Sequence, residues 1–347
     1  MIARTGTGPF SPAEIRTAIA RVPRVQLAAL PTPLQELPRL GLELGIGALY
    51  VKRDDLTGLG LGGNKVRNLE FRMAEAVALG ADVMIAGLEA QSNSARQTTA
   101  SANVLGMKTI LVLRTDRDWE WQGNLLIDRL LGAEVRFVET DDPAEMDRVL
   151  RVVAEEQRQL GRRPYVMNHA GAFAVGSALA YVLCTLEIVE QLGAVGKTPT
   201  HFYMASGNKG HAGLVLGRKL LGLDIRTIAI SQRHGDDRVS GAVRGALDAL
   251  EALGLDVPVT EDDVESYDEY VGTGYGRPSI GSIQAIKLAA RLEGLILDPV
   301  YTGKSMAGLI DHARQGLLGT DDVVVFVHTG GLPALFAFKD ELLRDDT

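Results

Sequence analysis

Short apolar runs alternate along the chain with longer segments of helical spacing. Runs such as Asp82–Ala86 and Thr109–Leu113 are nearly continuous in apolar residues, as expected for strands that are buried on both faces. Segments such as Lys65–Leu79 and Ala144–Leu160 repeat apolar residues at helical intervals, and the alternation predicts parallel sheets covered by helices. Further strands are predicted at 48–52, 134–138, 200–205, 225–231 and 323–328, and further helices at 94–105, 124–131, 174–192, 211–221, 281–293 and 305–315.

The strands and helices fall into two groups. We expect a larger domain formed by 1–65 and 165–347 and a smaller α/β domain formed by 66–164, because Arg162–Pro164 resembles a turn that returns the chain to the first unit. The predicted fold class is α/β, with two open twisted parallel-sheet domains and helices on both faces. Ligands of such sheets bind beyond the carboxyl ends of the strands, so the active site is expected in the cleft between the domains.

Composition excludes several classes of function. The formal net charge of −8 argues against a nucleic-acid binder, which depends on basic patches. The N-terminus lacks the pattern of a signal peptide, and we expect no apolar run to approach the ~20 residues that cross a bilayer. The single cysteine, Cys184, lies in an apolar run and is interpreted as a core residue. We therefore expect a soluble cytoplasmic protein that binds a small molecule, with no nucleic acid and no membrane as partners.

The first motif with chemical meaning is the glycine-rich turn Gly58–Gly63, which is followed at once by Lys65 at the start of a predicted helix. Glycines let the backbone approach a ligand closely. A helix start offers unpaired N–H groups and a positive dipole end, so a lysine there loses its proton more readily and can form a Schiff base. Taken alone the motif is weak, because most lysines near helix starts are simply solvated.

Two further polar segments follow predicted strands and open predicted helices. In Gln91–Gln97, Ser92 and Asn93 can present a hydroxyl, an amide and backbone N–H groups to a carboxylate, although for Ser92 or Ser94 alone an N-cap is the simpler interpretation. Ser206–Gly213 (SGNKGHAG) can form a nest of N–H groups for a phosphate. An ordinary tight connection between strand and helix is a serious alternative for this loop.

In combination and order, the motifs resemble the D-cysteine desulfhydrase and 1-aminocyclopropane-1-carboxylate deaminase family. The resemblance runs from about Pro31 to Phe338. It is carried by GGNKVR at 62–67, QSN and RQT within 91–98, GYG-x-P at 274–278, DPVYTGKSMAGL at 298–309 and HTGG at 328–331.

The resemblance implies a tryptophan-synthase-β-like fold (fold type II), pyridoxal 5'-phosphate as cofactor, a small amino-acid substrate and a homodimer. Lys65 would form the Schiff base, Asn93 would contact the ring oxygen, and Ser92 would hold the substrate carboxylate. Tyr275 and Tyr301 would line the substrate side. The implied catalytic residues are Lys65, Ser92, Tyr275 and Tyr301; the implied cofactor contacts are Lys65, Asn93, Ser206, Gly207, Asn208, Lys209, Gly210, His211, Thr302 and Thr329; the implied substrate contacts are Ser92, Asn93, Ser94 and Tyr275.

Two positions indicate the type of reaction. Deaminases of this family typically have glutamate after the tyrosine of DPVY and leucine in HxGG, whereas this chain has Thr302 and Thr329. A carboxylate beside the pyridine nitrogen keeps the ring protonated, while a hydroxyl gives a weaker, neutral hydrogen bond. The pattern favours α,β-elimination in the manner of D-cysteine desulfhydrase, with pyruvate, ammonia and sulfide as products.

Three departures from the family pattern leave alternatives open. Asn68 stands where the family usually has lysine, Ser94 where it usually has histidine, and Asn208–His211 replaces small hydroxyl residues. We hypothesise that Lys209 supplies the charge that is missing at position 68; a solvated lysine is the equal alternative. A specialised substrate, β-replacement, a deaminase reaction, or a non-catalytic relative that binds pyridoxal phosphate or an amino acid are the other interpretations.

Other polar residues receive structural interpretations. Asp54 and Asp55 are expected to pair with Arg53 and to cap the turn, and His328 is expected to be a buried structural histidine. The histidines lack metal-ligand spacing, so no metal site is predicted. Trp119 and its neighbours are expected to pack on their own domain, with a lid or an oligomer contact as the alternative.

Overall fold

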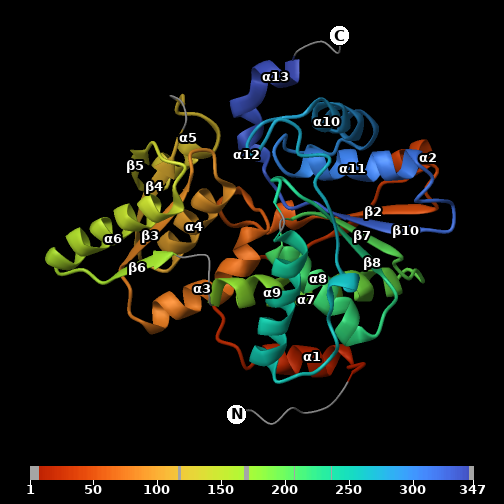
Figure 1. Cartoon of the computed structure of the whole chain (residues 1–347), viewed down its shortest axis with the longest axis horizontal. Coiled ribbons are helices and arrows are strands. Elements are labelled where there is room, and N and C mark those ends of the chain that lie inside the picture. The colour runs from red at the N-terminus through yellow and green to blue at the C-terminus, as the bar shows by residue number, and fades with distance from the viewer. Residues whose placement is uncertain (1–7, 116–118, 168–171, 207, 236, 344–347) are drawn as a thin grey trace.

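The computed structural model describes residues 8–115, 119–167, 172–206, 208–235 and 237–343. Within these residues the chain forms a six-stranded and a four-stranded sheet, which lie in two halves of the molecule (Figure 1). Helices cover both faces of each sheet. The α/β class with two open parallel sheets is therefore confirmed.

The larger sheet has the strand order β1-β2-β10-β7-β8-β9. All neighbouring strands are parallel except the edge strand β1, which pairs antiparallel with β2. The last strand of the chain, β10, lies between β2 and β7, so segments far apart in sequence end side by side. The strands are β1 (Leu34–Glu36), β2 (Ala48–Lys52), β7 (His201–Ala205), β8 (Arg226–Ile230), β9 (Glu265–Tyr267) and β10 (Val323–Val327).

The smaller sheet is wholly parallel, with the order β5-β4-β3-β6. Strand β6 begins at Pro164 and pairs with β3, so the sheet extends just past the predicted return point; the exact division into domains stays a prediction. The sequence pattern did not indicate β6, because the strand has only four residues and opens with proline. The strands are β3 (Val83–Glu89), β4 (Lys108–Arg114), β5 (Glu134–Val138) and β6 (Pro164–Met167).

The helices enclose the sheets in layers (Figure 1). On β10, Val324 and Phe326 pack with α2 (Pro38–Leu44), α10 (Ile280–Glu293) and α11 (Thr302–Arg314). Val325 and Val327 pack on the other face with α7 (Ala172–Gly193) and α8 (Lys209–Leu221). This alternation is the physical reason why the strand is apolar throughout. On the small sheet, Val83 and Ile85 of β3 face α6 (Pro143–Gln159). Met84 and Ala86 of the same strand face α3 (Lys65–Ala78), α4 (Asn93–Val104) and α5 (Gly123–Leu130) on the other side.

The longer helices agree with the predicted segments to within a few residues, and the sequence analysis missed α1, α2 and α9. The helices of eight or more residues are α1 (Pro12–Ile19), α3 (Lys65–Ala78), α4 (Asn93–Val104), α5 (Gly123–Leu130), α6 (Pro143–Gln159), α7 (Ala172–Gly193), α8 (Lys209–Leu221), α9 (Arg238–Leu253), α10 (Ile280–Glu293) and α11 (Thr302–Arg314). The shorter ones are α2 (Pro38–Leu44), α12 (Leu332–Leu335) and α13 (Lys339–Leu343), with single turns at Asp54–Leu56, Leu59–Leu61, Glu261–Asp263 and Phe336–Phe338.

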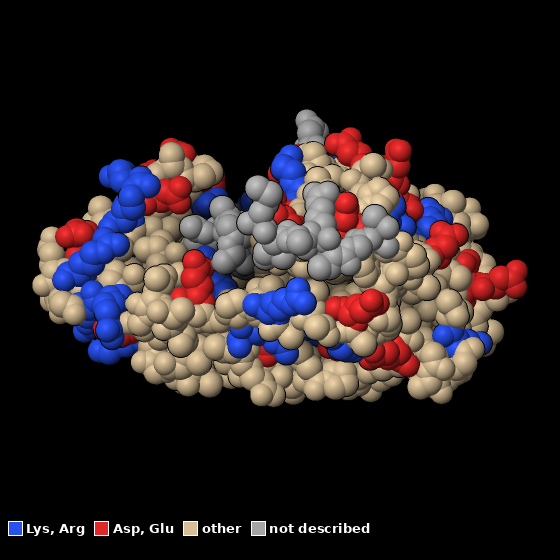
Figure 2. All heavy atoms as spheres, turned by 90° about the horizontal axis from the view of Figure 1, so that it is seen from below, with Lys and Arg blue, Asp and Glu red and all other residues tan. Residues whose placement is uncertain are grey.

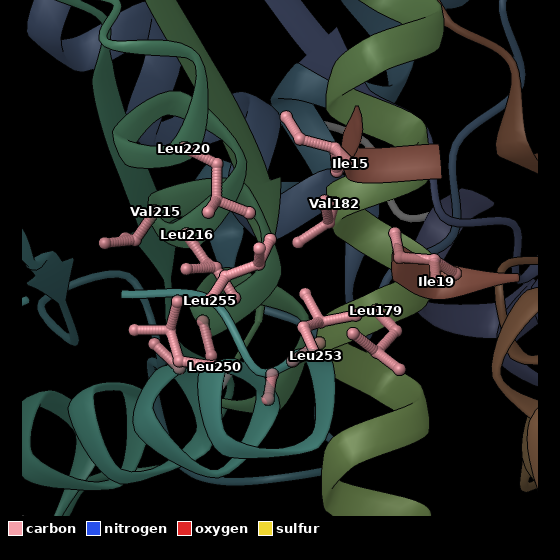
Figure 3. Close-up of a cluster of buried hydrophobic side chains, with 14 of the residues drawn as sticks. Ile15, Ile19, Leu179, Val182, Val215, Leu216, Leu220, Leu250, Leu253 and Leu255 are labelled. Atoms are coloured by element: carbon pink, nitrogen blue, oxygen red, sulfur yellow. The ribbon is translucent and has the colours of Figure 1, made fainter. Parts of the chain in front are cut away.

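Helix α9 escaped prediction because two glycines interrupt its apolar pattern. A Cβ added at Gly241 would lie 2.7 Å from the amide of Asn208, and one added at Gly245 would lie 3.2 Å from Ala212. The glycines therefore let α9 approach α8 closely. Figure 3 shows the resulting core, in which leucines of α8 and α9 meet Ile15 of α1 and Val182 of α7.

Helix α7 corrects one expectation from composition. Of the described residues, its segment Val175–Gly193 is long and apolar enough to cross a membrane by length and composition, so the prediction that no run reaches this length was wrong. The segment is 78% buried inside the structure, where it packs against α1, α3, α8 and α9. It is therefore a buried core helix of this fold.

Candidate functional site

A cavity of about 550 Å³ lies where strands of both sheets end. Residues that follow β2, β3, β7 and β10 line it, which is where open parallel sheets bind ligands. Its charged lining residues are four bases, Lys65, Arg114, Lys209 and Arg233, and one acid, Glu89. Figure 2 shows a notch between the two halves, with both basic and acidic side chains at its sides. The excess of basic groups suits an anionic ligand.

Lys65 lines this cavity at the first residue of α3. Burial lowers the pKa of its amine, because a low-polarity environment disfavours the charged form. Gly63, two residues before Lys65, has φ +118°, and a Cβ there would lie 2.5 Å from the Gln97 side chain. The helix start is fixed by Gln97, whose side-chain oxygen accepts from Val66 N–H at 3.0 Å. A reactive lysine is thus held in a defined position.

Arg96 fastens the glycine-rich turn to the small-sheet half. Its guanidinium donates to the carbonyls of Gly60 and Gly62, the latter at 3.0 Å. Its Nε donates to Asn124 Oδ1 at 2.8 Å. The RQT motif therefore has a structural function, because Arg96 and Gln97 join α4 to the loop that precedes Lys65.

Ser92 and Asn93 lie where β3 leads into α4. The Ser92 hydroxyl accepts from the N–H groups of Ser94 and Ala95 at 3.1 and 3.3 Å, so the N-cap interpretation is confirmed. Ser92, Asn93 and Ser94 also line the cavity. The hydroxyl proton of Ser92 can still be donated to a ligand.

Asn124, which the sequence analysis did not single out, sets the orientation of Asn93. Its Nδ2 donates to Asn93 Oδ1 at 3.0 Å and to the carbonyl of Gln91 at 2.9 Å. Its own oxygen accepts from Arg96. Because the Asn93 oxygen is engaged in this way, its NH2 group is the part that can donate to a ligand.

The loop between β7 and α8 forms the second end of the cavity. Ser206, Asn208, Lys209 and Gly210 line it, and Gly207 lies outside the described residues. Burial, followed by the positive charges of Arg72 and Lys65, lowers the pKa of Lys209 to about 8. Lys209 is half-buried and lines the cavity as the first residue of α8, where anions are stabilised. This position favours the hypothesis that Lys209 faces the ligand over the alternative of a solvated lysine.

His211 is not brought to the cavity. It is fully buried, its Nε2 lies 2.7 Å from the carbonyl oxygen of Thr227, and burial lowers its pKa to about 4. It is therefore a neutral side chain that ties α8 to β8. The predicted cofactor contact of this side chain has to be withdrawn, because the histidine points into the sheet instead.

Two tyrosines form a wall of the cavity. The hydroxyl groups of Tyr275 and Tyr301 form a hydrogen bond with each other, and burial raises the pKa of Tyr301 well above its usual value. The guanidinium of Arg233 lies 3.8 Å from the ring centroid of Tyr275. Lys304 anchors the loop of Tyr275 by donating to the carbonyl of Gly274 at 3.1 Å.

The two diagnostic threonines have different positions. Thr329 lines the cavity, and its carbonyl accepts from Asn64 N–H at 3.0 Å. Thr302 is fully buried and does not line it. Its hydroxyl donates to Asp298 at 2.7 Å and accepts from Asp298 N–H at 2.8 Å. The structure therefore does not bring the Thr302 hydroxyl to the ligand, because α11 uses it at its own N-terminus.

The acidic pair before the glycine-rich turn is structural, as expected, but only in part through Arg53. Arg53 pairs with Asp55 at 2.7 Å, whereas Asp54 is buried and pairs with Arg67 at 2.8 Å. Arg67 also pairs with Glu187 at 2.8 Å, and Glu187 pairs with Lys52 at 2.7 Å. This buried cluster joins β2, α3 and α7 behind Lys65.

Other structural interpretations are confirmed. Cys184 is buried, and its burial raises the pKa of the thiol, so it is a core residue. His328 is also buried, with Nε2 2.9 Å from the carbonyl of Ile296. Trp119 packs against the core of the small-sheet half, as expected, and its ring also lies edge-on to Phe338 of the C-terminal segment at 6.0 Å.

Several lining residues were not predicted. Glu89 and Arg114 are the last residues of β3 and β4, so the rule that ligands bind beyond strand ends could have identified them. Ser177 and Tyr181 come from α7, and no local sequence pattern marks them. The lining also contains Asn64, Asn68, Gly87, Leu88, Pro143, Met204, Ala205, Gln232, Arg233 and Gly330.

The arrangement fits pyridoxal phosphate. Lys65 offers an amine of lowered pKa at one place, and the start of α8 with Lys209 offers an anion site at another. The buried Asn68 lines the cavity, and its Oδ1 has no hydrogen-bond partner among the described residues. A carboxamide can turn so that its NH2 group donates to a phosphate. Gly330 packs closely against Gly63 in the loop before Lys65, because a Cβ added at Gly330 would lie 2.8 Å from Gly63 Cα.

Comparisons with known proteins agree with this geometry. Residues 25–330 match the family model described as pyridoxal-phosphate dependent enzyme. A Salmonella typhi D-cysteine desulfhydrase is 39% identical over 326 residues, which cover 92% of this chain and 97% of that protein. A Pyrococcus horikoshii protein named after 1-aminocyclopropane-1-carboxylate deaminase is 40% identical over 332 residues, with 95% and 98% covered.

Solved structures give the same picture. The crystal structure of a homologue of ACC deaminase has a TM-score of 0.85 and 38% identity, with 96% of this chain and 99% of that chain covered. A diaminopropionate ammonia lyase from Escherichia coli, at 17% identity and a TM-score of 0.65, shares the fold. The fold is that of type II pyridoxal-phosphate enzymes, as expected. The chain therefore belongs to the family of pyridoxal-phosphate-dependent enzymes that includes the relatives of D-cysteine desulfhydrase and 1-aminocyclopropane-1-carboxylate deaminase.

Proposed function

We propose that this protein catalyses α,β-elimination on a small β-substituted amino acid, in the manner of D-cysteine desulfhydrase, and releases pyruvate, ammonia and, from cysteine, sulfide. The observation that carries the proposal is that Lys65, a lysine of lowered pKa, and Thr329 line the same cavity. Position 329 is one of the two at which the desulfhydrase pattern differs from the deaminase pattern. The deaminase pattern has leucine at this position, so the Thr329 hydroxyl adds a neutral hydrogen-bonding group to the cavity wall that the deaminase pattern lacks.

Pyridoxal phosphate, when bound, supplies an electron-withdrawing ring that stabilises negative charge at the substrate Cα. The chain's own residues do the rest. The lowered pKa of Lys65 makes its neutral amine available to take the α-proton, which is the function of a general base. The Cβ–S bond then breaks, and its electron pair leaves with sulfur. The remaining unsaturated amine is hydrolysed by water to pyruvate and ammonia.

Residues at the two ends of the cavity would orient the substrate and the cofactor. Ser92 and the N–H groups at the start of α4 would hold the substrate carboxylate, with Asn93 donating toward the ring oxygen of the cofactor. The loop of Ser206 and Lys209 would hold the phosphate. The hydrogen-bonded pair of Tyr275 and Tyr301 would form the side at which the leaving group departs.

The test uses the cofactor-loaded enzyme with D-cysteine, and quantifies pyruvate and sulfide. We expect both products in equal amounts from the wild type and neither from Lys65→Ala. The matched control is Lys197→Ala, which changes an exposed lysine after α7 and should leave the rate unaltered. If 1-aminocyclopropane-1-carboxylate reacted faster than D-cysteine and L-cysteine, elimination would have to be abandoned in favour of deamination.

Assembly and location belong to the same proposal. The family resemblance supports a homodimer, and light scattering of the purified protein would measure its mass in solution. The composition supports a cytoplasmic enzyme, since the one cysteine is buried and forms no internal disulfide.

A further inference from the structure

A second cavity of about 380 Å³ adjoins the first. The two share Glu89, Ser92, Arg114, Arg233, Tyr275 and Tyr301 as walls. Neither Lys65 nor the loop of Lys209 lines the second cavity. It is therefore an annex on the substrate side of the first cavity, and a molecule bound at Ser92 can extend into it.

The annex is lined by three guanidinium groups, those of Arg114, Arg233 and Arg277, and by two carboxylates. Asp141 is exposed to solvent at its rim. Glu89 Oε1 lies 3.3 Å from Arg233 Nη2 and 3.7 Å from Arg114 Nη1. One carboxylate thus faces two guanidinium groups.

Arg114 provides a more specific observation. Its Nε is buried and has no hydrogen-bond partner among the described residues. A buried N–H without an acceptor is unfavourable, and an oxyanion bound within reach of this group would satisfy it. Guanidinium groups are well suited to this task because they bind carboxylates and similar oxyanions through parallel N–H donors.

The rest of the annex suits an apolar chain that connects the part of a ligand bound at Ser92 to an acidic group bound by the arginines. Trp119 and Phe338 form one side, with their rings edge-on at 6.0 Å. Tyr275 stands at the boundary with the first cavity, and the guanidinium of Arg233 covers its ring at 3.8 Å. A cysteine side chain has a single atom beyond Cβ and does not reach so far.

We propose that the annex binds an oxyanion at the end of the substrate's β-substituent, so that the preferred substrates are β-substituted alanines whose leaving group carries an acidic group. This inference rests on the proposed elimination and names its substrate class. The bonds that break are the same, Cα–H and Cβ–S, and the acidic group leaves with the thiol.

The probes are S-(2-carboxyethyl)cysteine and its carboxamide, in both configurations, because they have the same length and differ by one charge. Turnover is followed as pyruvate, and binding as the change in the absorption spectrum of the holoenzyme. We expect kcat/KM to be at least about tenfold higher for the carboxylate, since tenfold corresponds to about 1.4 kcal/mol. The difference should lie mainly in KM, because the contact is far from the reacting atoms.

Arg277 is the residue to change, since it lines the annex and does not line the first cavity. In Arg277→Gln the preference for the carboxylate should fall severalfold, with Arg277→Lys intermediate. The control is Arg158→Gln on α6, where the arginine is exposed and pairs with Glu155; it should keep the full preference. The cofactor absorption band and the melting temperature of each variant verify that it is folded and loaded.

The outcomes separate the two proposals. Equal turnover of both probes would retain elimination and overturn the annex as an oxyanion site, as would a preference that persists in Arg277→Gln. If neither probe reacts but the carboxylate binds more tightly and Arg277→Gln abolishes the difference, the annex stands and elimination fails. Absence of both turnover and discriminating binding would overturn both.

Discussion

Single side chains orient the groups that meet a ligand, and Asn124 is the clearest example. It donates to Asn93 Oδ1 at 3.0 Å and accepts from Arg96 at 2.8 Å. A carboxamide can make both contacts at once, because it donates on one side and accepts on the other. Asn124 is thus a positioning residue that acts through Asn93.

Asn124→Asp should disturb this orientation without removing volume. Aspartate can still accept from Arg96 but cannot donate to Asn93, so the Asn93 amide is free to turn over. We expect kcat to fall about tenfold, which corresponds to a lost hydrogen bond of about 1.5 kcal/mol, and the cofactor absorption band to shift. Asn103→Asp in α4 is the control, because its donated bond to Leu131 is exposed. An unshifted spectrum would contradict the assigned role.

The charge of Lys209 should govern retention of an anion. Its pKa is lowered to about 8 by burial and by the charges of Arg72 and Lys65, so the lysine is protonated at pH 7 and neutral at pH 9. Affinity of the apoenzyme for inorganic phosphate should therefore decrease as pH rises through 8. Calorimetric titration at pH 7, 8 and 9 measures this.

Lys209→Ala should remove that pH dependence and weaken cofactor retention in dialysis. Lys108→Ala is the matched control, because Lys108 is exposed at the start of β4. Equal retention of the cofactor in the two variants would end the hypothesis that Lys209 replaces the charge missing at Asn68.

Between elements, the buried cluster of Lys52, Asp54, Arg67 and Glu187 connects β2, α3 and α7. Burial opposes ionisation of Glu187, but the hydrogen bonds and charge of Arg67, followed by those of Lys52, lower its pKa overall. The stabilisation is therefore complete above the unfolded value of about 4.3 and is lost as pH falls through the lower folded value.

Glu187→Gln should cost about 3–5 kcal/mol of unfolding free energy at pH 7, because it leaves buried cations without their partner. Urea titrations at pH 7 and at progressively lower pH would show that the difference from wild type shrinks in acid. Glu190→Gln, on the exposed face of α7 where Glu190 pairs with Arg16, should cost less than about 1 kcal/mol. Similar losses in the two variants would argue against the cluster.

Over the whole molecule, the cavity draws its walls from both sheets, so a ligand that fills it contacts both halves. Cofactor binding should therefore stabilise the complete fold. At a free concentration one hundred times Kd, the gain is about 2.7 kcal/mol. Thermal unfolding of apoenzyme and holoenzyme at several cofactor concentrations measures it, and Lys65→Ala should show a smaller gain. Unchanged melting at saturation would place the cofactor elsewhere.

The sequence by itself determined the local features of this protein. Strand and helix periods predicted both sheets, because each apolar run has to be covered on two faces. Glycines before Lys65 and the cap at Ser92 follow from short-range geometry, so their positions at helix starts were predictable. Parallel topology then brings the ends of β2, β3, β7 and β10 to one place, which explains why the motif residues met in one cavity.

Only the tertiary structure decided which way side chains of the same motif point. Thr302 and His211 lie in motifs but are used inside the fold, whereas Thr329 and Lys209 reach the cavity. Partners such as Arg67 and Glu187 are 120 positions apart, and no local pattern encodes such a pair. The annex likewise joins Arg114, Arg277 and Phe338 from three distant segments. These features depend on how packed elements share space, which periodicity along the chain does not specify.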